Sequence, residues 1–321
     1  MQEPEPDASK VAVVVPAYKD ASHIGQVIRG IPTWLTRIYV VDDGCPFNSG
    51  DAAEAVEDPR VVVIRRAANG GVGAAVKTGY RRALEDGYDI VVKMDGDDQM
   101  DPAHLPTLLA PLRSGRADYA KGNRFRDLKA LRQMPRVRLF GNRALTFLVR
   151  AASGYWRMTD PTNGYTAIDR AALERLDLDG VADGYFFESD MLIRLNIAGA
   201  VVEDVAIPAR YGDEQSSLRI PAILPVFIYR LARGMTKRIL YKYFLYDFSL
   251  GSFYLLAGTL LTGFGAAFGA MKWWQAAQAE VPATTGTVMI AVLTLLLGVQ
   301  FLVQALNFDI NSEPKRPGDN D

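Results

Sequence analysis

The residues best suited to chemistry in this sequence are the acidic side chains of MDGDDQMDP, at positions 94–102. They end DIVVKMD (89–95), a run rich in Val and Ile that is typical of a buried strand. A strand ending in Asp-x-Asp places two carboxylates at the carboxyl edge of a parallel sheet, where open α/β sheets bind ligands. Hard divalent cations prefer oxygen ligands and commonly bridge substrate phosphates. We therefore expect Asp95, Asp97 and Gln99 to hold Mg²⁺ or Mn²⁺ on a substrate diphosphate, although such a cluster alone is also typical of a solvated turn.

Three further motifs are expected at the same edge of the sheet. VPAY (15–18) ends the first predicted strand, where a proline and an aromatic ring can form the wall of a base pocket. Asp42 and Asp43 end the second strand, where a carboxylate can accept hydrogen bonds from a nucleobase. NGGVG (69–73) precedes a predicted helix and allows close backbone approach. It departs from G-x-G-x-x-G and follows the third strand, not the first, which argues against a dinucleotide-dependent dehydrogenase.

The elements that must position these residues alternate between short β-branched runs and longer helical stretches. Strands are predicted at 11–16, 38–43, 61–66 and 89–95, and helices at 22–31, 50–56 and 73–87. Strands separated by helices at this spacing predict an α/β domain with a mostly parallel sheet covered on both faces.

Charge is distributed unevenly along the chain. The 36 Lys and Arg residues nearly balance the 37 Asp and Glu residues, so the net charge of −1 argues against nucleic acid as a partner. Residues 248–271 and 281–308 contain no charged side chain, and each run is long enough to span a bilayer. The pattern therefore disfavours both a wholly soluble protein and a polytopic transporter.

The segment before the first apolar run predicts an amphipathic helix at the membrane surface. Apolar residues from Ile220 to Met235 recur at helical spacing, and basic residues take the other face: Arg230, Arg233, Lys237 and Arg238. A helix packed on the preceding domain is the alternative. Basic residues precede the first span, while the loop between the spans holds only Lys272 and Glu280. The positive-inside rule then places the large domain and the tail in the cytoplasm of a protein integral to the cytoplasmic (inner) membrane.

These observations divide the chain into six parts. They are a disordered N-terminus (1–10), an α/β domain (11–217), juxtamembrane amphipathic helices (218–243), two transmembrane helices (244–271 and 285–308) and a cytoplasmic tail (309–321). The acidic N-terminus has no apolar run, so no secretory signal is predicted. The single Cys45 cannot form an intrachain disulfide.

Six motifs together give the sequence a resemblance to the family 2 glycosyltransferases of GT-A fold, and more narrowly to the polyprenyl-phosphate sugar synthases. That group includes dolichol-phosphate mannose synthase and bacterial polyprenyl-phosphate glucosyltransferases. The motifs are VVPAYKD (14–20), VVDDG (40–44), MDGDDQ (94–99), KGNR (121–124), DPTNGY (160–165) and GYFFESDML (184–192). The resemblance implies a GT-A domain followed by membrane helices. It also implies a divalent metal, Mg²⁺ or Mn²⁺, and transfer of one sugar from a UDP- or GDP-sugar to a polyprenyl phosphate.

The resemblance further implies roles for individual residues. The donor contacts would be Pro16, Tyr18, Asp20, Val41, Asp43, Asp95, Gly96, Asp97, Arg124 and Arg210. Asp95, Asp97 and Gln99 would hold the metal, and the acceptor phosphate would lie against Arg124, Arg138 and Asn142. Catalysis would depend on Asp97, Arg124 and Arg138.

The chain departs from the family pattern at three places. Lys19-Asp20 stands where the family has Asn-Glu, and Gln215-Ser216-Ser217 stands where it has Ser-Lys. The lysine that would meet the donor diphosphate is therefore missing, and Lys77 or Arg219 could replace it. The Gln-x-x-Arg-Trp element of processive synthases is also absent from the sequence, which argues against polymer synthesis.

Glu188 leaves a second function open. A phosphate acceptor is already anionic at pH 7 and can attack the anomeric carbon without a strong base, inverting it. Transferases with hydroxyl acceptors carry a carboxylate base near Glu188, so a saccharide hydroxyl on a lipid-linked glycan is an alternative acceptor. Glu188 is equally consistent with the first turn of a helix, where the helix dipole stabilises a carboxylate.

A third possible function belongs to a different functional class. In it, the protein is not an enzyme but a partner in membrane assembly or lipid flipping that keeps the fold for binding. The intact Asp-x-Asp-x-Gln and Arg124 argue against it, because a protein that only binds would be free to lose them. A homo-oligomer is compatible with each of the three functions.

Overall fold

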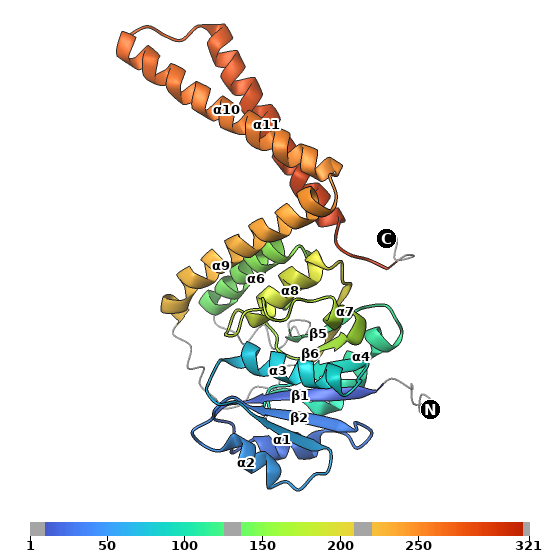
Figure 1. The fold of residues 1–321 in the computed structure, drawn as a ribbon. Coiled ribbons are helices and arrows are strands. Elements are labelled where there is room, and N and C mark those ends of the chain that lie inside the picture. The colour runs from blue at the N-terminus through green and yellow to red at the C-terminus, as the bar shows by residue number, and fades with distance from the viewer. Residues whose placement is uncertain (1–9, 125–135, 209–219, 317–321) are drawn as a thin grey trace. The chain divides into compact units, whose positions relative to one another are not determined.

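The structure is a computed structural model that describes residues 10–124, 136–208 and 220–316, and it divides into two units (Figure 1). The first unit is Met1–Arg238 together with Pro314–Asp321, and the second is Ile239–Glu313. The predicted disordered segment 1–10 and the end of the predicted tail lie almost entirely outside the described residues.

A seven-stranded sheet forms the centre of the first unit. Its strands are β1 (Val11–Ala17), β2 (Arg37–Asp42), β3 (Val61–Arg65), β4 (Ile90–Lys93), β5 (Tyr119–Asn123), β6 (Thr166–Asp169) and β7 (Val202–Ala206), in the order β3-β2-β1-β4-β6-β5-β7. Only β6 runs antiparallel to its neighbours, β4 and β5, among the described strands. The prediction of a mostly parallel sheet is confirmed.

Helices cover both faces of this sheet. One face carries α1 (Ile24–Gly30), α2 (Ser49–Glu54) and α4 (Leu105–Arg113), the last preceded by a 3-10 turn, Pro102–His104. The other carries α3 (Val72–Glu85), α6 (Arg136–Ser153), α7 (Arg170–Glu174) and α8 (Phe187–Ile197). Successive strand residues enter opposite layers: Val13 and Val15 pack in the first layer, and Ala12 and Val14 in the second.

Helix α9 (Ile220–Leu240) contains Pro225 yet continues without a break, and all of it up to Arg238 belongs to the first unit. The ring of Phe227 contacts that of Phe186, and Leu231 is buried in the core. Arg238, which we expected on the exposed basic face, is instead buried. Its guanidinium donates to the carbonyls of Ala151 and Ala152, near the end of α6. Helix-terminal carbonyls need such donors, which explains the burial.

The second unit is a helical hairpin. A π-helical segment, Tyr241–Tyr246, precedes α10 (Leu250–Ala279) and α11 (Thr285–Asn311). Glycines allow the two long helices close contact: a Cβ on Gly265 would lie 2.7 Å from the Leu295 amide nitrogen. Helix α10 extends beyond the predicted span, because nothing in WWQAAQA (273–279) breaks a helix until Glu280 adopts a left-handed backbone (φ 51°).

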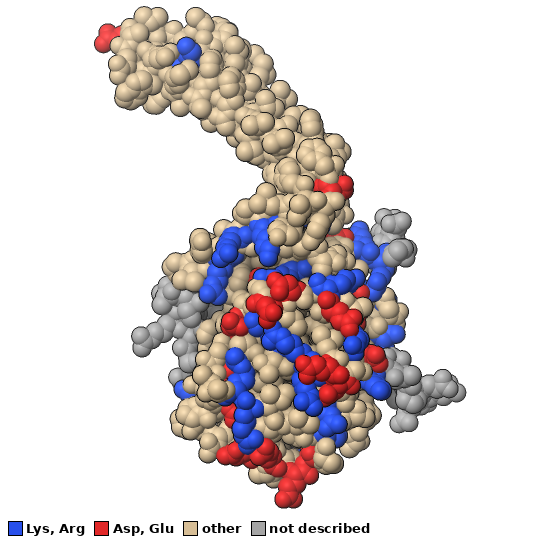
Figure 2. Space-filling view, viewed as in Figure 1, with Lys and Arg blue, Asp and Glu red and all other residues tan. Residues whose placement is uncertain are grey.

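Both hairpin helices are long and apolar enough to cross a membrane, by length and composition. In the apolar 18-residue window of each helix, only 11% (α10) and 6% (α11) is buried. The core helix of a soluble protein would be mostly buried. Figure 2 shows few charged side chains along the visible face of the hairpin, whereas acidic and basic side chains are interspersed over the first unit.

Candidate active site

A cavity of about 520 Å³ lies at the carboxyl ends of β4 and β5 in the first unit. It brings together five of the predicted functional residues: Asp95, Asp97, Gln99, Arg124 and Glu188. Its remaining wall is mostly apolar and includes Val72, Leu145, Tyr185, Ile207, Pro208, Leu224 and Phe227. The cavity lining therefore combines charged side chains with apolar ones suited to hydrocarbon.

The Asp-x-Asp turn directly follows β4. Asp97 Oδ1 accepts a hydrogen bond from the Gln99 amide at 3.0 Å, and Asp98 has a left-handed backbone, with φ 60°. Asp95, Asp97 and Gln99 thus line the cavity together, and their oxygen atoms fit a hard divalent cation such as Mg²⁺ or Mn²⁺. The described residues contain no group of three or more His, Cys, Asp or Glu that could hold a metal. A cation here would therefore take its remaining ligands from the substrate or water.

Lys93, the last residue of β4, lies among these carboxylates. Its side chain is 1% exposed, and Nζ is 2.7 Å from Asp95 Oδ1 and 3.2 Å from Glu188 Oε1. Burial lowers the pKa of this ammonium, but the charges of Asp95 and Glu188 outweigh burial and raise the pKa overall. Lys93 is therefore a fixed positive charge that joins the Asp-x-Asp turn to α8.

Gly164 is the residue that allows this arrangement. Lys93 Nζ also donates to the Gly164 carbonyl at 3.2 Å. A Cβ on Gly164 would lie 2.5 Å from Lys93 Nζ and 2.7 Å from Asp95 Oδ2. Glycine in DPTNGY (160–165) thus makes room for a buried ion pair and does not by itself indicate a ligand contact.

Arg124 follows β5 and is held by Asp160. Its Nε donates to Asp160 Oδ2 at 2.8 Å and its Nη2 to Oδ1 at 3.0 Å, a bidentate pair. Asp160 is completely buried, whereas 40% of the Arg124 side chain is exposed. Asp160 therefore fixes the plane of a guanidinium that faces the cavity.

A second buried lysine, Lys121, connects β5 to the segment DPTNGY (160–165). Lys121 is fully buried in β5 and donates to the carbonyl of Asn163, whose side-chain amide donates to the Gly122 carbonyl at 2.7 Å. Burial lowers the pKa of Lys121 to about 8. KGNR (121–124) and DPTNGY (160–165) thus form one hydrogen-bonded unit at the edge of the cavity.

The predicted donor contacts on β1 and β2 lie beside the cavity lining, not within it. Pro16 and Val41 are buried register partners on these adjacent strands. Asp20 Oδ2 accepts from the Tyr18 amide at 2.9 Å and would lie 3.2 Å from a Cβ on Gly96. The structure therefore brings Asp20 and Gly96 together, and 37% of Tyr18 is exposed next to them.

Asp43 is almost fully engaged inside the protein. Its carboxylate pairs with Arg66 and accepts from the amides of Gly70 (3.1 Å) and Gly71 (2.7 Å). Only 2% of the residue is exposed. A nucleobase contact at Asp43 remains a prediction, and its observed contacts fix the glycine-containing loop.

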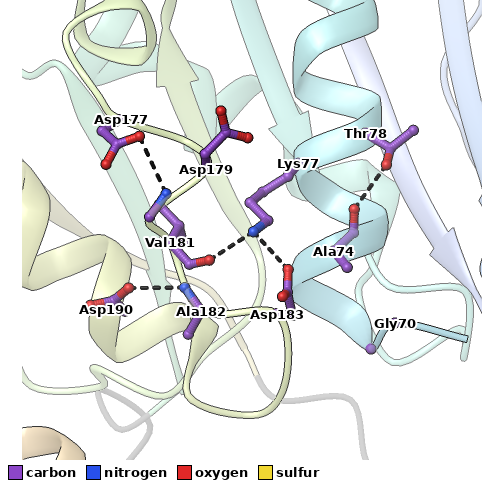
Figure 3. Close-up of polar contacts among 12 residues, drawn as sticks. Gly70, Ala74, Lys77, Thr78, Asp177, Asp179, Val181, Ala182, Asp183 and Asp190 are labelled. Carbon is purple, nitrogen blue, oxygen red and sulfur yellow. Dashed lines mark hydrogen bonds and ion pairs between the residues drawn. The ribbon is translucent and has the colours of Figure 1, made fainter.

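The glycine run (69–73) and Lys77 both contact the segment that contains Val181 and Asp183. A Cβ on Gly71 would lie 2.7 Å from the carbonyl oxygen of Asp183. Lys77, on α3, points to the same segment: Nζ donates to the Val181 carbonyl at 2.7 Å and lies 2.6 Å from Asp183 Oδ1 (Figure 3). Lys77 is not among the residues that line the cavity, so this geometry gives no support to Lys77 as a replacement for the missing lysine.

Several predicted residues cannot be placed. Arg210 and the stretch 215–219 lie outside the described residues. Arg138 and Asn142 belong to α6, but their side chains also lie outside the described part of the chain.

Sequence reasoning missed four residues of the site region: Lys93, Lys121, Asp160 and Tyr185. A signal existed for Lys93, because a lysine in a strand that is otherwise apolar requires a buried counter-charge. The Asp160 partner of Arg124 lies 36 residues away in sequence, and only the fold brings the two together.

Comparison with known proteins places these motifs in a wider group. The family model described as "Glycosyl transferase family 2" matches residues 12–177. The chain is 33% identical over 205 residues to an undecaprenyl-phosphate mannosyltransferase of Micrococcus luteus, covering 62% of this chain and 82% of the relative. It is 34% identical over 203 residues to a polyprenol monophosphomannose synthase of Mycolicibacterium smegmatis, covering 60% and 75%.

A solved structure shares the fold. Glucosyl-3-phosphoglycerate synthase from Mycobacterium tuberculosis, crystallised with Mn²⁺, UDP-glucose and glycerol 3-phosphate, superimposes with a TM-score of 0.52. The match covers 72% of this chain and 80% of that chain at 21% sequence identity. At that identity the likeness concerns the fold alone.

Proposed function

Because the chain belongs to glycosyltransferase family 2, we propose that it transfers a single sugar from a UDP- or GDP-sugar to a polyprenyl phosphate, with inversion at the anomeric carbon. The two bacterial relatives support this acceptor, since both are named for sugar transfer to polyprenyl carriers. The donor would lie over the ends of β1, β2 and β4, where Tyr18, Asp20 and Gly96 meet.

The mixed lining of the cavity is the observation that carries this proposal. A polyprenyl phosphate has an anionic head and an apolar chain, and the cavity lining contains groups suited to each. Arg124 is among the charged residues that line it, and Leu145, Leu224 and Phe227 are among the apolar ones. A hydroxyl acceptor on a soluble molecule would have no use for those apolar side chains.

The chemistry requires positioning more than a strong base. An oxygen of the acceptor phosphate forms the new bond to the anomeric carbon while the bond from that carbon to the diphosphate oxygen breaks. The electron pair of the broken bond leaves with the nucleoside diphosphate. Arg124, with Arg138 and Asn142, would hold the acceptor phosphate in line, and this orientation together with charge stabilisation lowers the barrier.

Asp95, Asp97 and Gln99 would hold a divalent cation, Mg²⁺ or Mn²⁺. When bound, such a cation neutralises charge on a diphosphate leaving group. The carboxylates of this chain contribute by fixing its place at the end of β4.

The proposed acceptor lies in a membrane, and the hairpin supplies an anchor for it. We propose that α10 and α11 span the cytoplasmic membrane and that the catalytic domain is cytoplasmic. The exposed apolar residues of α9, such as Val226 and Tyr229, support contact with the membrane surface.

Transfer of radiolabelled sugar to undecaprenyl phosphate tests the proposal directly. The full-length protein in detergent is given Mn²⁺ or Mg²⁺ and a panel of UDP- and GDP-sugars. We expect label in the organic phase with one donor, abolished by EDTA. Asp97→Asn should lower turnover at least about 100-fold, as expected when a ligand of the cation that offsets charge on the leaving diphosphate is lost.

Asp98→Asn is the matched control for that substitution. It makes the same chemical change one residue further along the turn, at a side chain bonded to Gln26. Asparagine also tolerates the left-handed backbone at this position. Near-normal turnover of Asp97→Asn, or equal losses in both variants, would contradict the proposed role of Asp97.

Glu188 supports a second candidate, transfer to a saccharide hydroxyl on a lipid-linked glycan. It lines the cavity and carries the carboxylate that a general base needs. Its Oε1 accepts a hydrogen bond from the buried Lys93 at 3.2 Å, so a substrate hydroxyl would have to share this carboxylate with Lys93. A loss of about 1,000-fold or more in Glu188→Gln, measured with a lipid-linked saccharide acceptor, would favour this candidate.

A further inference from the structure

Lys93 is a cation placed where a divalent cation is expected to bind. Three carboxylates line the cavity (Asp95, Asp97 and Glu188), together with two cations, Lys93 and Arg124. Asp160 holds Arg124 in a bidentate pair, whereas Lys93 contacts two of the cavity carboxylates directly. The charge balance at the Asp-x-Asp turn therefore depends on Lys93.

The contacts of Lys93 direct its influence toward Asp95. Lys93 Nζ forms an ion pair with Asp95 Oδ1 at 2.7 Å and donates hydrogen bonds to Glu188 Oε1 and to the Gly164 carbonyl, both at 3.2 Å. Its side chain is 1% exposed. Lys93 is therefore held inside the protein by these contacts, and its ion pair with Asp95 brings its charge to ligands at the turn.

We propose that Lys93 is a positioning residue that occupies Asp95 in the ligand-free protein, so that a divalent cation binds strongly only together with the nucleotide diphosphate. This inference rests on the proposed function, since it concerns the same donor site. A fixed positive charge at Asp95 repels a second cation at the turn. The diphosphate supplies negative charge and oxygen ligands that offset this repulsion, so metal and nucleotide each strengthen the binding of the other by the same factor.

Mn²⁺ binding to the full-length protein in detergent tests the inference without any turnover. Free Mn²⁺ is measured by electron paramagnetic resonance, with and without UDP or GDP. We expect weak binding alone and at least about tenfold tighter binding with the nucleotide. Lys93→Met should bind Mn²⁺ alone at least about tenfold more tightly than the native protein and lose most of the nucleotide effect.

Lys121→Met is the matched control, because it removes the same buried charge elsewhere in the site region. Lys121 donates to the Asn163 carbonyl and is fully buried like Lys93. If Lys93 weakens Mn²⁺ binding through its direct contact with Asp95, loss of the Lys121 charge should change the Mn²⁺ affinity less than about threefold. Asp97→Asn added to Lys93→Met should abolish the tight binding, which locates the ion at the turn.

Glu188→Gln keeps the test decisive if Lys93→Met does not fold. It leaves Lys93 paired with Asp95 alone, so Mn²⁺ should bind several-fold more weakly. The inference is overturned if Lys93→Met and Lys121→Met behave alike, if folded Glu188→Gln binds Mn²⁺ more tightly, or if tight binding survives Asp97→Asn. Failure of sugar transfer with the Mn²⁺ results intact would instead remove the proposed acceptor and leave the inference standing.

Discussion

The charged residues that line the cavity are held by buried partners. Asp160 is completely buried and orients Arg124, and Lys93, which belongs to the lining but is only 1% exposed, holds Asp95 and Glu188. Such supporting contacts fix the geometry of a site before a ligand arrives. Substitutions of the buried partners should therefore affect activity through position and not through lost substrate contacts.

Asp160→Asn tests this view of Arg124. Asparagine has a similar shape but cannot offer two anionic oxygens to the guanidinium, so Arg124 loses its bidentate partner. Misplacement of a catalytic group by about 1 Å can cost roughly 100-fold in rate. We expect kcat/KM for the acceptor to fall about ten- to 100-fold in the transfer assay, with a smaller change in KM for the donor.

Asp58→Asn is the control for general destabilisation. Asp58 is also held in a bidentate pair, by Arg60 Nε on Oδ1 (3.0 Å) and Arg60 Nη2 on Oδ2 (2.7 Å), and this pair lies outside the residues that line the cavity. Equal loss of activity in both variants would show that Asp160 is needed only for folding.

At this scale the sequence predicted several residues that line the cavity and not the contacts that hold them in place. Asp95, Asp97 and Arg124 lie in short motifs whose spacing can be read directly. Glu188 approaches Lys93 from α8, 95 positions along the chain. No local pattern could have joined them, because the contact depends on how α8 packs over the sheet.

The elements of the domain were more predictable than these contacts. Four predicted strands and three predicted helices appear at nearly the expected positions, because β-branched runs and helical periodicity are local signals. The antiparallel strand β6 was not predicted. It comprises only Thr166–Asp169, and so short a run has no distinctive period.

Lys77 connects α3 to the segment 181–186. This segment contains Tyr185 and directly precedes α8. The ammonium holds the Val181 carbonyl and Asp183, and the Ala74 amide donates to the Asp183 carbonyl at 3.1 Å (Figure 3). Lys77→Met should cost about 1.5–3 kcal/mol of local stability, since it removes bonds made by a charged donor. We expect roughly ten- to 100-fold faster amide exchange at Ala74 and a severalfold lower kcat/KM, measured by hydrogen exchange and the transfer assay.

Arg81→Met provides the comparison on the same helix. Arg81 pairs with Asp179, but both side chains are largely exposed, and such surface pairs contribute only about 0–1 kcal/mol. Unchanged exchange in Lys77→Met, or the same change in both variants, would rule out a specific role for Lys77 in holding the segment.

For the whole molecule, the charge distribution and the apolar hairpin lead to a single prediction of topology. By the positive-inside rule, the basic residues before α10, among them Arg230, Arg233 and Lys237, predict a cytoplasmic location for the proposed catalytic domain. A nucleotide-sugar donor is consistent with that side, because such donors are made in the cytoplasm of the cell. The connection between α10 and α11 would then face outward.

Cys45 allows this topology to be measured, because it is the only cysteine in the chain. Burial opposes its ionisation, but Sγ accepts hydrogen bonds from the Ser49 hydroxyl and from the Lys19 amide, both at 3.1 Å, and these lower the pKa of the thiol. A lowered pKa increases the reactive thiolate fraction near neutral pH. A membrane-impermeant maleimide should therefore label inverted membrane vesicles and leave intact cells unlabelled.

The reciprocal variant makes that result decisive. Cys45→Ser combined with Gln278→Cys moves the thiol to an exposed position near the end of α10, so intact cells should now be labelled and sealed inverted vesicles should not. Labelling of both variants from the same side would mean that the hairpin does not cross the membrane. The opposite pattern in both would place the catalytic domain outside the cell, away from its nucleotide-sugar donor, and the proposed function would have to be abandoned with the topology.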